Sequence, residues 1–353
     1  MSLSPSIVLQ ALKQVQDPDL KQDLVTLGMV QDLVIAPPRV SFTLVLTTPA
    51  CPFQAMLRKA CGTAVESVLP PGWEVEVQLR SQVTSRRERS SVLSDVKNIV
   101  AIASGKGGVG KSTVAVNLAV SLAACGARVG LLDADIFGPS VPHMLGCPQE
   151  RLSASGRGEK NQLQPLKRYG VQVVSMGLLV EEGEAILWRG PMAGKALQQM
   201  LQDTNWGPLD YLLVDLPPGT SDIPLTLVRQ VDLTGAVLVT TPQQVAVADV
   251  ERALAMLRKP GVDVPVLGLI ENMAYWSPSE SSAKIYPFGS QGGLSLAQRC
   301  RLTVLGQIPL LPQICTGGDQ GRPAALDAAK HFFEAAAAAL AQQVALRNAR
   351  APE

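Results

Sequence analysis

Short, almost uninterrupted apolar runs alternate with helix-length segments from Asn98 onward, and this alternation restricts the fold more than any other feature of the chain. Runs without polar alternation are typical of strands buried on both faces, and helical crossovers join parallel strands. We therefore predict an α/β fold with a doubly wound, mostly parallel sheet. The expected strands span 99–103, 129–132, 171–175, 211–214, 236–239, 266–270 and 304–308. The expected helices span 111–124, 194–202, 245–257, 294–301 and, at the Ala-rich end, 323–350.

The first 80 residues follow a different pattern. An amphipathic stretch at 7–15 precedes two β-like runs, 40–46 and 73–79, and a helix-compatible segment, 52–68, lies between these runs. This order predicts a small α+β domain over residues 1–80.

A polar stretch separates the two patterns. Residues 81–97 contain Arg86, Arg87 and Arg89 without an apolar period, which favours a solvated linker over a phosphate-binding patch. The chain of 353 residues is therefore expected to hold two domains, the second over residues 98–353.

Composition excludes several classes of protein. Hydrophobic residues make up 46% of the chain and charged residues 17%, which excludes general disorder. Thirty-one Lys and Arg against 30 Asp and Glu leave a net charge of +1, so no global field favours nucleic acid or an anionic membrane. No apolar run is long enough to span a bilayer, and a cytoplasmic protein is expected. The six cysteines include no C-x-x-C pair and predict no disulfide framework: Cys51, Cys61, Cys125, Cys147, Cys300 and Cys315.

A glycine-rich motif, Gly105-Lys-Gly-Gly-Val-Gly-Lys-Ser112, fits G-x-x-x-x-G-K-[ST] between an expected strand and an expected helix. The glycines allow the backbone to curl with its N–H groups inward, at the positive end of the helix dipole. Lys111 is expected to reach the β- and γ-phosphates of a nucleotide, and the Ser112 hydroxyl to hold magnesium. An ordinary strand–helix turn is the alternative.

Carboxylates follow two of the expected strands. Asp133 and Asp135 come just after the run 129–132, and their spacing of two places both on one side, so both are expected to point out of the sheet edge near the P-loop. Asp135 is the candidate that orients the attacking water, and Asp133 is expected to support the water shell of magnesium. Asp215 ends the run 211–214 as a Walker B carboxylate does and is expected to act on metal-bound water. Capping of the strand end is the alternative for Asp133 and Asp135.

The extra lysine, Lys106, makes the motif resemble the deviant Walker A sequence K-G-G-V-G-K-[ST] of ATPases such as ParA, MinD and the nitrogenase iron protein. That resemblance implies a homodimeric ATPase in which Lys106 crosses to the partner's nucleotide as an arginine finger does elsewhere, and a solvent-facing lysine is the alternative. The expected catalytic residues are Lys106, Lys111, Asp133 and Asp135, with Ser112, Asp133 and Asp215 for magnesium. The expected ATP-binding residues are Gly105, Lys106, Gly107, Gly108, Val109, Gly110, Lys111, Ser112, Thr113 and Asn272.

Several further segments resemble one subfamily, the Mrp/ApbC iron–sulfur carrier ATPases, over residues 95–340. They are Asp135-Ile-Phe-Gly-Pro-Ser-Val-Pro142, Trp188-Arg-Gly-Pro-Met192, Leu209-Asp-Tyr-Leu-Leu-Val-Asp-Leu-Pro-Pro-Gly-Thr220, Glu271-Asn-Met273 and Asp319-Gln-Gly-Arg-Pro323. The resemblance implies that Asn272 hydrogen-bonds adenine and that the partners are apo iron–sulfur proteins or assembly scaffolds. It assigns no role to Trp188 or Arg189.

The first domain resembles the small iron–sulfur-assembly domain that often precedes such ATPases, through Asp17-Pro-Asp-Leu20, Asp23-Leu-Val-Thr-Leu-Gly28 and Thr47-Thr-Pro-Ala-Cys-Pro52. Cys51 precedes an expected helix, whose N-terminus is expected to lower the pKa of the thiol and favour iron binding. A buried structural cysteine is the alternative.

The chain departs from the carrier pattern in one place. Carriers bear a C-x-x-C shortly after the E-N-M segment, whereas residues 274–289 contain no cysteine. Either an iron–sulfur cluster uses other thiols such as Cys51, or this ATPase has lost cluster carriage. The resemblance thus predicts an ATPase of iron–sulfur cluster assembly or transfer, and the alternative is a positioning or partitioning switch like ParA and MinD.

Overall fold

The computed structural model describes residues 3–86, 93–155, 162–179, 190–219, 231–278 and 283–349. The chain divides into two compact units, Met1–Thr84 with Ala345–Glu353, and Ser85–Val344. The expected boundaries at 80 and 98 remain a prediction. Of the expected linker, residues 87–92, with Arg87 and Arg89, lie outside the described residues.

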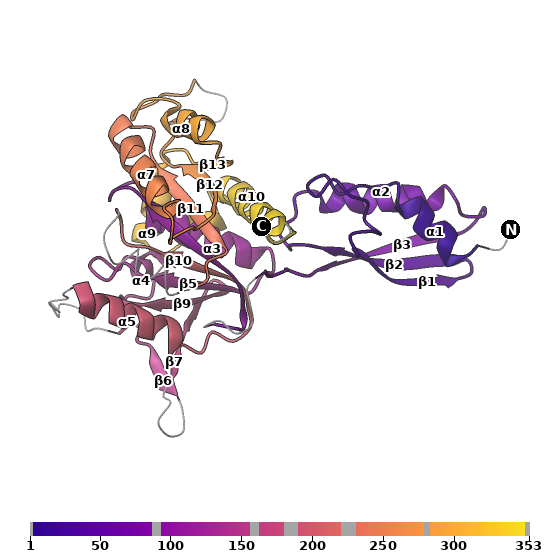
Figure 1. Ribbon diagram of the computed structural model, residues 1–353, viewed down its shortest axis with the longest axis horizontal. Coiled ribbons are helices and arrows are strands. Elements are labelled where there is room, and N and C mark those ends of the chain that lie inside the picture. Colours follow the sequence, from indigo (N-terminus) through magenta and orange to yellow (C-terminus); the bar gives the residue numbers. More distant parts are fainter. Residues whose placement is uncertain are drawn as a thin grey trace. The chain divides into compact units, whose positions relative to one another are not determined.

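The N-terminal unit is a three-stranded sheet with two helices (Figure 1). Its elements are α1 (Pro5–Leu12), β1 (Val30–Ala36), β2 (Arg39–Leu46), α2 (Gln54–Glu66) and β3 (Glu74–Ser81). β1 runs antiparallel to β2, and β2 runs parallel to β3 through the crossover α2. The α+β prediction is confirmed for both apolar runs and the helix between them. The first helix ends at Leu12 rather than Val15, and β1 was not expected.

The larger unit is built on an eight-stranded sheet of order β13-β12-β11-β4-β10-β5-β9-β8. Its strands are β4 (Val96–Ser104), β5 (Val129–Asp133), β8 (Leu166–Arg168), β9 (Val171–Ser175), β10 (Leu209–Asp215), β11 (Gly235–Thr240), β12 (Val266–Glu271) and β13 (Val304–Gln307). All neighbours pair in parallel except β8, which runs antiparallel to β9. The predicted doubly wound, mostly parallel sheet is confirmed; β8 and the small hairpin of β6 (Ser153–Ser155) and β7 (Gln162–Gln164) were not expected.

Helices cover both faces of this sheet (Figure 1). α5 (Gly190–Gln202), α7 (Gln244–Leu257) and α8 (Gly292–Cys300) share one hydrophobic cluster with the sheet. The buried residues of α3 (Lys111–Ala124) lie outside that cluster, and α3 packs on β4, β5 and β10 from the other side. The remaining elements are α4 (Val141–Met144), η1 (Met176–Leu178), α9 (Pro312–Asp319), η2 (Ala324–Leu326) and α10 (Lys330–Ala349). None of the described helices is long and apolar enough to cross a membrane.

The terminal helix differs from its prediction at one end. α10 begins at Lys330, not at residue 323, because Pro323 opens the short 3₁₀ turn η2. The three apolar side chains that recur at helical spacing, Phe333, Leu340 and Val344, are buried as the pattern indicates.

An ion cluster joins the three central strands at the edge opposite the P-loop. Asp210 of β10 accepts hydrogen bonds from Lys97 Nζ of β4 at 2.9 Å and from the Arg128 guanidinium, just before β5, at 2.9 and 3.1 Å. Burial alone would raise the pKa of Asp210, but the hydrogen bonds from Arg128, with help from Lys97, lower it to about 2. The carboxylate is therefore stabilised in the folded state relative to the unfolded chain.

We expect Asp210→Asn to lower the free energy of unfolding at pH 7 by about 2 kcal/mol, because the lowered pKa is worth that much in the ionised form. The contribution is complete above the unfolded pKa of about 4 and disappears as the pH falls toward 2. Urea unfolding of both proteins at pH 7 and pH 3 measures the difference. The exposed Arg322–Asp327 pair supplies the control, since Asp327→Asn should change little at either pH. An Asp210→Asn effect equal at pH 7 and pH 3 would contradict this account.

Candidate functional site

The glycine-rich motif forms the turn between β4 and α3, where its flanking pattern placed it. Gly108 and Gly110 have φ of 83° and 80°, a left-handed conformation that favours glycine. A Cβ on Gly110 would also lie 2.3 Å from Asn272 Nδ2. The turn therefore requires glycine at position 110 for both its conformation and its contact.

The backbone amides of this turn are available to a ligand. Within the described part of the chain, the N–H groups of Lys106 to Gly110 donate no hydrogen bond. They stand at the N-terminus of α3, a helix of 14 residues, whose first amides also lack partners within the helix. Adjacent unpaired amides at a helix N-terminus form a cradle for an anion such as phosphate.

Lys111 and Asp215 form a buried ion pair beside this cradle. Lys111 Nζ lies 2.6 Å from Asp215 Oδ1 and 3.2 Å from Ser112 Oγ. The Lys111 side chain is 6% exposed and that of Asp215 is fully buried. The Walker lysine, the Walker serine and the carboxylate at the tip of β10 are thus brought together, as the two motifs predicted.

The second oxygen of Asp215 has no partner. Asp215 Oδ2 is buried and receives no hydrogen bond from any described residue. Burial raises the pKa of Asp215, Lys111 opposes this rise, and the Asp135 carboxyl adds to it. An orphaned carboxylate oxygen next to a serine hydroxyl is a hard oxygen donor set that fits Mg²⁺ and its bound water.

Asp133 and Asp135 differ in environment. Asp133 is fully buried at the tip of β5: its Oδ2 accepts from Ser175 Oγ at 2.9 Å and from the Val141 amide at 3.3 Å, and its Oδ1 accepts from the Asp135 amide at 3.2 Å. Burial, and then the Asp215 carboxyl on the neighbouring strand, raise the pKa of Asp133. Asp135 lies beyond the strand and is partly exposed.

Asp133 is thus enclosed by the segment that follows β5, since two of its donors are the Asp135 amide and the amide of Val141 at the start of α4. Its expected role at the magnesium site stays a prediction. Ser175, which sequence reasoning missed, is opposite Asp133 in the β5–β9 register.

Lys106 is partly exposed, and no described residue forms an ion pair with its ammonium. Its carbonyl accepts a hydrogen bond from Ser104 Oγ at 3.0 Å, which fixes the backbone at the start of the turn. Nothing within the described part of this chain therefore holds the charged end of the side chain.

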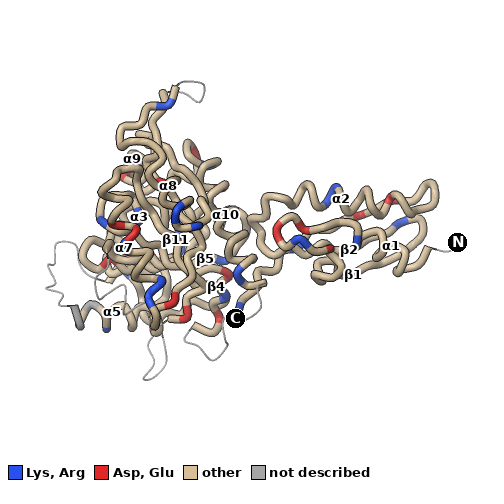
Figure 2. Tube along the Cα trace, turned by 45° about the horizontal axis from the view of Figure 1, so that its top comes forward, with Lys and Arg blue, Asp and Glu red and all other residues tan. Residues whose placement is uncertain are grey.

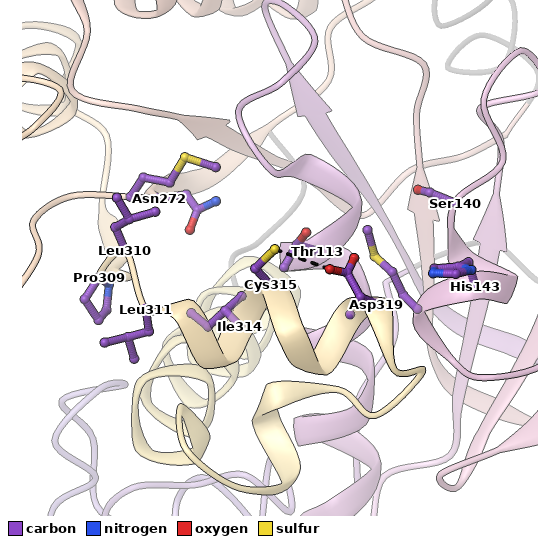
Figure 3. A pocket seen from close by; sticks show the side chains of 13 residues that line it. Thr113, Ser140, His143, Asn272, Pro309, Leu310, Leu311, Ile314, Cys315 and Asp319 are labelled. Atoms are coloured by element: carbon purple, nitrogen blue, oxygen red, sulfur yellow. Dashed lines mark hydrogen bonds between the residues drawn. The ribbon is translucent and has the colours of Figure 1, made fainter.

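A pocket of about 290 Å³ lies beside the P-loop helix (Figure 3). Its lining combines Thr113 and Asn272 with an apolar wall from the segment after β13 and from α9. The lining residues are Thr113, Ser140, His143, Met144, Asn272, Met273, Pro309, Leu310, Leu311, Ile314, Cys315, Gly318 and Asp319. Of these residues, the sequence predicted only Thr113 and Asn272 as binding residues. The apolar run Pro309-Leu-Leu-Pro312 was the available signal for the apolar wall.

Asn272 joins this pocket to the P-loop. Its Nδ2 donates to the Val109 carbonyl at 2.9 Å, and its side chain is nearly buried. No described residue donates to its Oδ1. The amide therefore presents a free acceptor close to the pocket.

Cys51 departs from the sequence expectation. It lies three residues before α2 and is half-buried in the N-terminal unit. Burial raises the pKa of its thiol most, the Phe53 amide opposes this rise, and Asp17 and Asp19 add to it. The prediction of a lowered pKa is wrong, because burial, with the carboxylates of Asp17 and Asp19, outweighs the amides of Phe53 and Gln54 at the start of α2. Among the described residues, no group of three or more His, Cys, Asp or Glu side chains could hold a metal ion.

Trp188 and Arg189, which belong to the segment that resembled the carrier subfamily, lie outside the described residues, as do Thr220, Ser279 and Ser281.

A glycine-rich turn between a buried strand and a helix, with its lysine and a Walker B carboxylate in contact, defines a P-loop nucleotide-binding protein. Residues 95–345 match the family model described as NUBPL iron-transfer P-loop NTPase, and residues 6–79 match that of an iron–sulfur cluster assembly protein. The chain belongs to this P-loop NTPase family, and the resemblance inferred from its motifs is confirmed.

Relatives and a solved structure agree with this assignment. An iron–sulfur cluster carrier protein of Synechocystis is 45% identical over 347 residues, covering 97% of each chain. A protein of the same name from Deinococcus radiodurans is 45% identical over 97% of this chain and 96% of its own. The nucleotide-binding protein of Archaeoglobus fulgidus, solved in complex with ADP, is 36% identical with a TM-score of 0.59, covering 69% of this chain and 94% of its own.

Proposed function

We propose that the chain binds Mg-ATP at the P-loop and hydrolyses it as a homodimer, and that this cycle serves iron–sulfur cluster assembly or transfer to apoproteins. One observation carries the nucleotide part. Lys111 directly follows the unpaired amides of Lys106 to Gly110 and its ammonium contacts Asp215, whose Oδ2 is orphaned, so one site offers both a phosphate cradle and a metal-compatible carboxylate.

The chain's own residues divide the work of binding. The turn amides and Lys111 would hold the phosphates, with Gly105 to Thr113 forming the loop. Ser112 and Asp215 would hold Mg²⁺, partly through water. Asp133, next to Asp215 in the sheet, would support the water shell of the ion. Magnesium would supply charge neutralisation on the phosphates.

Asp135 would orient the attacking water. Its backbone N–H donates to Asp133, which fixes its position at the tip of β5, while its carboxylate remains partly exposed. Lys106 would act on the partner's nucleotide, a role supported by the absence of any ion pair with its ammonium in the described part of this chain.

Asn272 would select adenine. Since its Nδ2 is engaged by Val109, the group left to a ligand is the Oδ1 acceptor. An acceptor pairs with the exocyclic amino group of adenine and not with the corresponding carbonyl of guanine. The apolar wall of the neighbouring pocket suits a flat base.

The cluster is the cargo in this proposal. The two relatives named above are iron–sulfur cluster carrier proteins by name. With no cysteine in residues 274–289, Cys51 is the candidate ligand in the unit that matches an assembly protein. Its raised pKa means that iron binding would release a proton from the thiol.

Anaerobic reconstitution of the full chain with iron and sulfide tests the cargo. We expect a visible charge-transfer absorption in the wild type and its loss in Cys51→Ala, because a cluster needs thiolate ligands. Cys61→Ala is the matched control: Cys61 lies in the same unit but is fully buried, and burial raises its pKa to about 11. A colourless wild type, or equal absorption in Cys51→Ala, would remove Cys51 as the ligand.

No observation favours the positioning switch. Among the described residues, Lys and Arg are interspersed with Asp and Glu along both units and do not gather in one block (Figure 2).

A further inference from the structure

The sheet of the N-terminal unit has an open edge at β3. Among the described residues, β3 pairs only with β2 (Figure 1). The opposite edge, β1, is irregular: its register shifts between Gln31 and Val34, and Asp32 has a φ of 54°. An irregularity of this kind hinders the pairing of a further strand with the edge. β3 has no such irregularity, since its register against β2 is continuous from Glu74 to Ser81.

The backbone bonds show which β3 residues face outward. The Glu74 N–H donates to the Pro38 carbonyl, and the Gln82 N–H donates to the Leu46 carbonyl. In a parallel ladder, the N–H and C=O of one residue point to the same side and alternate residues face opposite sides. The even-numbered residues therefore bond to β2, and the odd-numbered residues Val75, Val77 and Leu79 direct their backbone groups to the open edge.

A groove of about 760 Å³ runs along this edge, between β3 and α2. One side is lined by α2, where the small residues Ala55, Gly62 and Thr63 alternate with the polar and charged residues Gln54, Arg58, Lys59 and Glu66, and a Cβ on Gly62 would meet nothing within 4 Å. The apolar side chains of β3 line the other side, and Leu79 is 39% exposed. The groove therefore has room for further apolar side chains on the helix side of an added strand.

The other face of β3 carries alternating polar side chains. Glu74, Glu76, Gln78 and Arg80 are all exposed, and the acidic pair begins the strand while the arginine stands near its end. Arg39 of β2 contacts both glutamates, at 3.3 and 3.5 Å, from the paired side of the strand, and the Arg80 guanidinium donates to Gln31 Oε1 of β1 at 2.6 Å, so the pairs across the new edge would form beside or in exchange for these contacts. When two copies of Glu74-Val-Glu-Val-Gln-Leu-Arg80 are aligned antiparallel, their charges are complementary. At each end of the alignment, the Glu74 carboxylate of one copy lies opposite the Arg80 guanidinium of the other.

We propose that β3 pairs antiparallel with β3 of a second copy of this chain, in the register centred on Val77. Val77 then faces the partner's Val77 and exchanges two backbone hydrogen bonds with it, as does Val75 with the partner's Leu79. Glu74 faces the partner's Arg80 in a pair whose side chains are close. The apolar side chains of each added strand enter the groove beneath α2 of the other copy.

Three conditions together select this register: the direction of the backbone groups, the charges and the apolar side chains. Residues whose backbone groups point to the open edge must lie opposite residues of the same kind, so each alternative register moves the residue opposite a given position by two. A shift in one direction places Glu76 opposite the partner's Glu76, and like charges directly opposite are destabilising. A shift in the other direction sets Glu76 opposite the partner's Arg80, but it also leaves Val75 opposite the partner's Ser81. Only the register centred on Val77 combines an ion pair at each end with apolar side chains opposite one another throughout the groove face.

Disulfide formation in the full chain tests the register. The proposal places residue 76 opposite residue 78 of the partner, with Cα atoms about 4.5 Å apart, within reach of a disulfide. An equal mixture of Glu76→Cys and Gln78→Cys chains, oxidised without nucleotide, should therefore give several-fold more cross-linked dimer on a non-reducing gel than either variant alone. Wild type treated in the same way gives the background from the native cysteines.

Each other outcome overturns the proposal. A mixture no better than wild type means that the edge does not pair with a second copy. Predominant linkage of the Glu76→Cys chains with one another, or of the Gln78→Cys chains with one another, means a different register. Because nucleotide takes no part, the result is independent of the function proposed above.

Charge reversal tests the proposed ion pair between Glu74 and the partner's Arg80. Glu74→Arg or Arg80→Glu, added to the cysteine variants, should lower the yield several-fold, and both changes together should restore it. Lys13→Glu, a reversal on the same unit away from β3, should leave the yield unchanged. Failure of the double variant to recover would contradict the ion pair.

Discussion

Replacing Lys111 by alanine should abolish nucleotide binding. The change removes the ammonium that lies 2.6 Å from Asp215, on the residue that directly follows the amide cradle. Loss of a buried, hydrogen-bonded charge partner costs about 3 kcal/mol or more, so the Kd for Mg-ATP should rise roughly a hundredfold or more. Isothermal titration measures the Kd. A second readout is the rise in Tm on adding Mg-ATP, which should disappear in the variant.

Lys106→Ala is the matched control for this prediction. It removes the same charge from the same turn, but the Lys106 ammonium has no ion-pair partner among the described residues of this chain. Its Kd should rise far less than that of Lys111→Ala, because Lys106 would reach a nucleotide only across the closed dimer. Because Lys111→Ala also leaves Asp215 buried without its cation, the unfolding of both variants is first compared without nucleotide. A Lys111→Ala protein that binds Mg-ATP within tenfold of wild type would overturn the phosphate site.

Replacing Asp135 by alanine should stop turnover while nucleotide binding persists. Asp135 is partly exposed at the tip of β5 and contributes no ligand to the cradle, so its loss leaves the phosphate contacts in place. Removing a positioned base or water-orienting carboxylate lowers kcat by about 10² to 10⁴. The Kd should be unchanged or slightly lower, because the Asp135 carboxyl no longer raises the pKa of Asp215. Phosphate release and titration on the same sample separate the two quantities.

Asp203→Ala supplies the comparison for Asp135. Asp203 is an exposed carboxylate just after α5, and its loss should change neither kcat nor Kd. A parallel loss of kcat in both variants would point to a general charge effect. An Asp135→Ala protein with wild-type turnover would remove Asp135 from the reaction.

The central strands and the P-loop were predictable because each combines a local pattern with a local cause. β4, β5 and β10 are buried on both faces, so apart from Lys97, Asn98 and Asp210 near their starts they are largely apolar, and they end at the polar residues that mark the sheet edge. The turn after β4 needs glycine for its left-handed backbone conformation, so the glycines of the motif indicate the turn directly. In these segments, the residue types themselves determine the local structure.

Other features depended on contacts between distant segments. β1 is half-exposed and interrupted at Asp32, so it lacks the apolar run by which β2 was recognised. Ser175 binds Asp133 only because β9 lies next to β5, a neighbour relation that no motif states. The thiol of Cys51 has a raised pKa because it is half-buried and because Asp17 and Asp19 come near it from an earlier part of the chain.

The cluster of Lys97, Asp210 and Arg128 has a consequence for how the molecule can respond to a nucleotide. It ties together β4, β10 and β5, the same three strands whose opposite ends carry the P-loop, Asp215 and Asp133. Strands fastened at one end and hydrogen-bonded along their length form a stiff platform. Any rearrangement on nucleotide binding then falls to the loops beyond the strand tips, while the amides of the platform itself should exchange their hydrogens slowly.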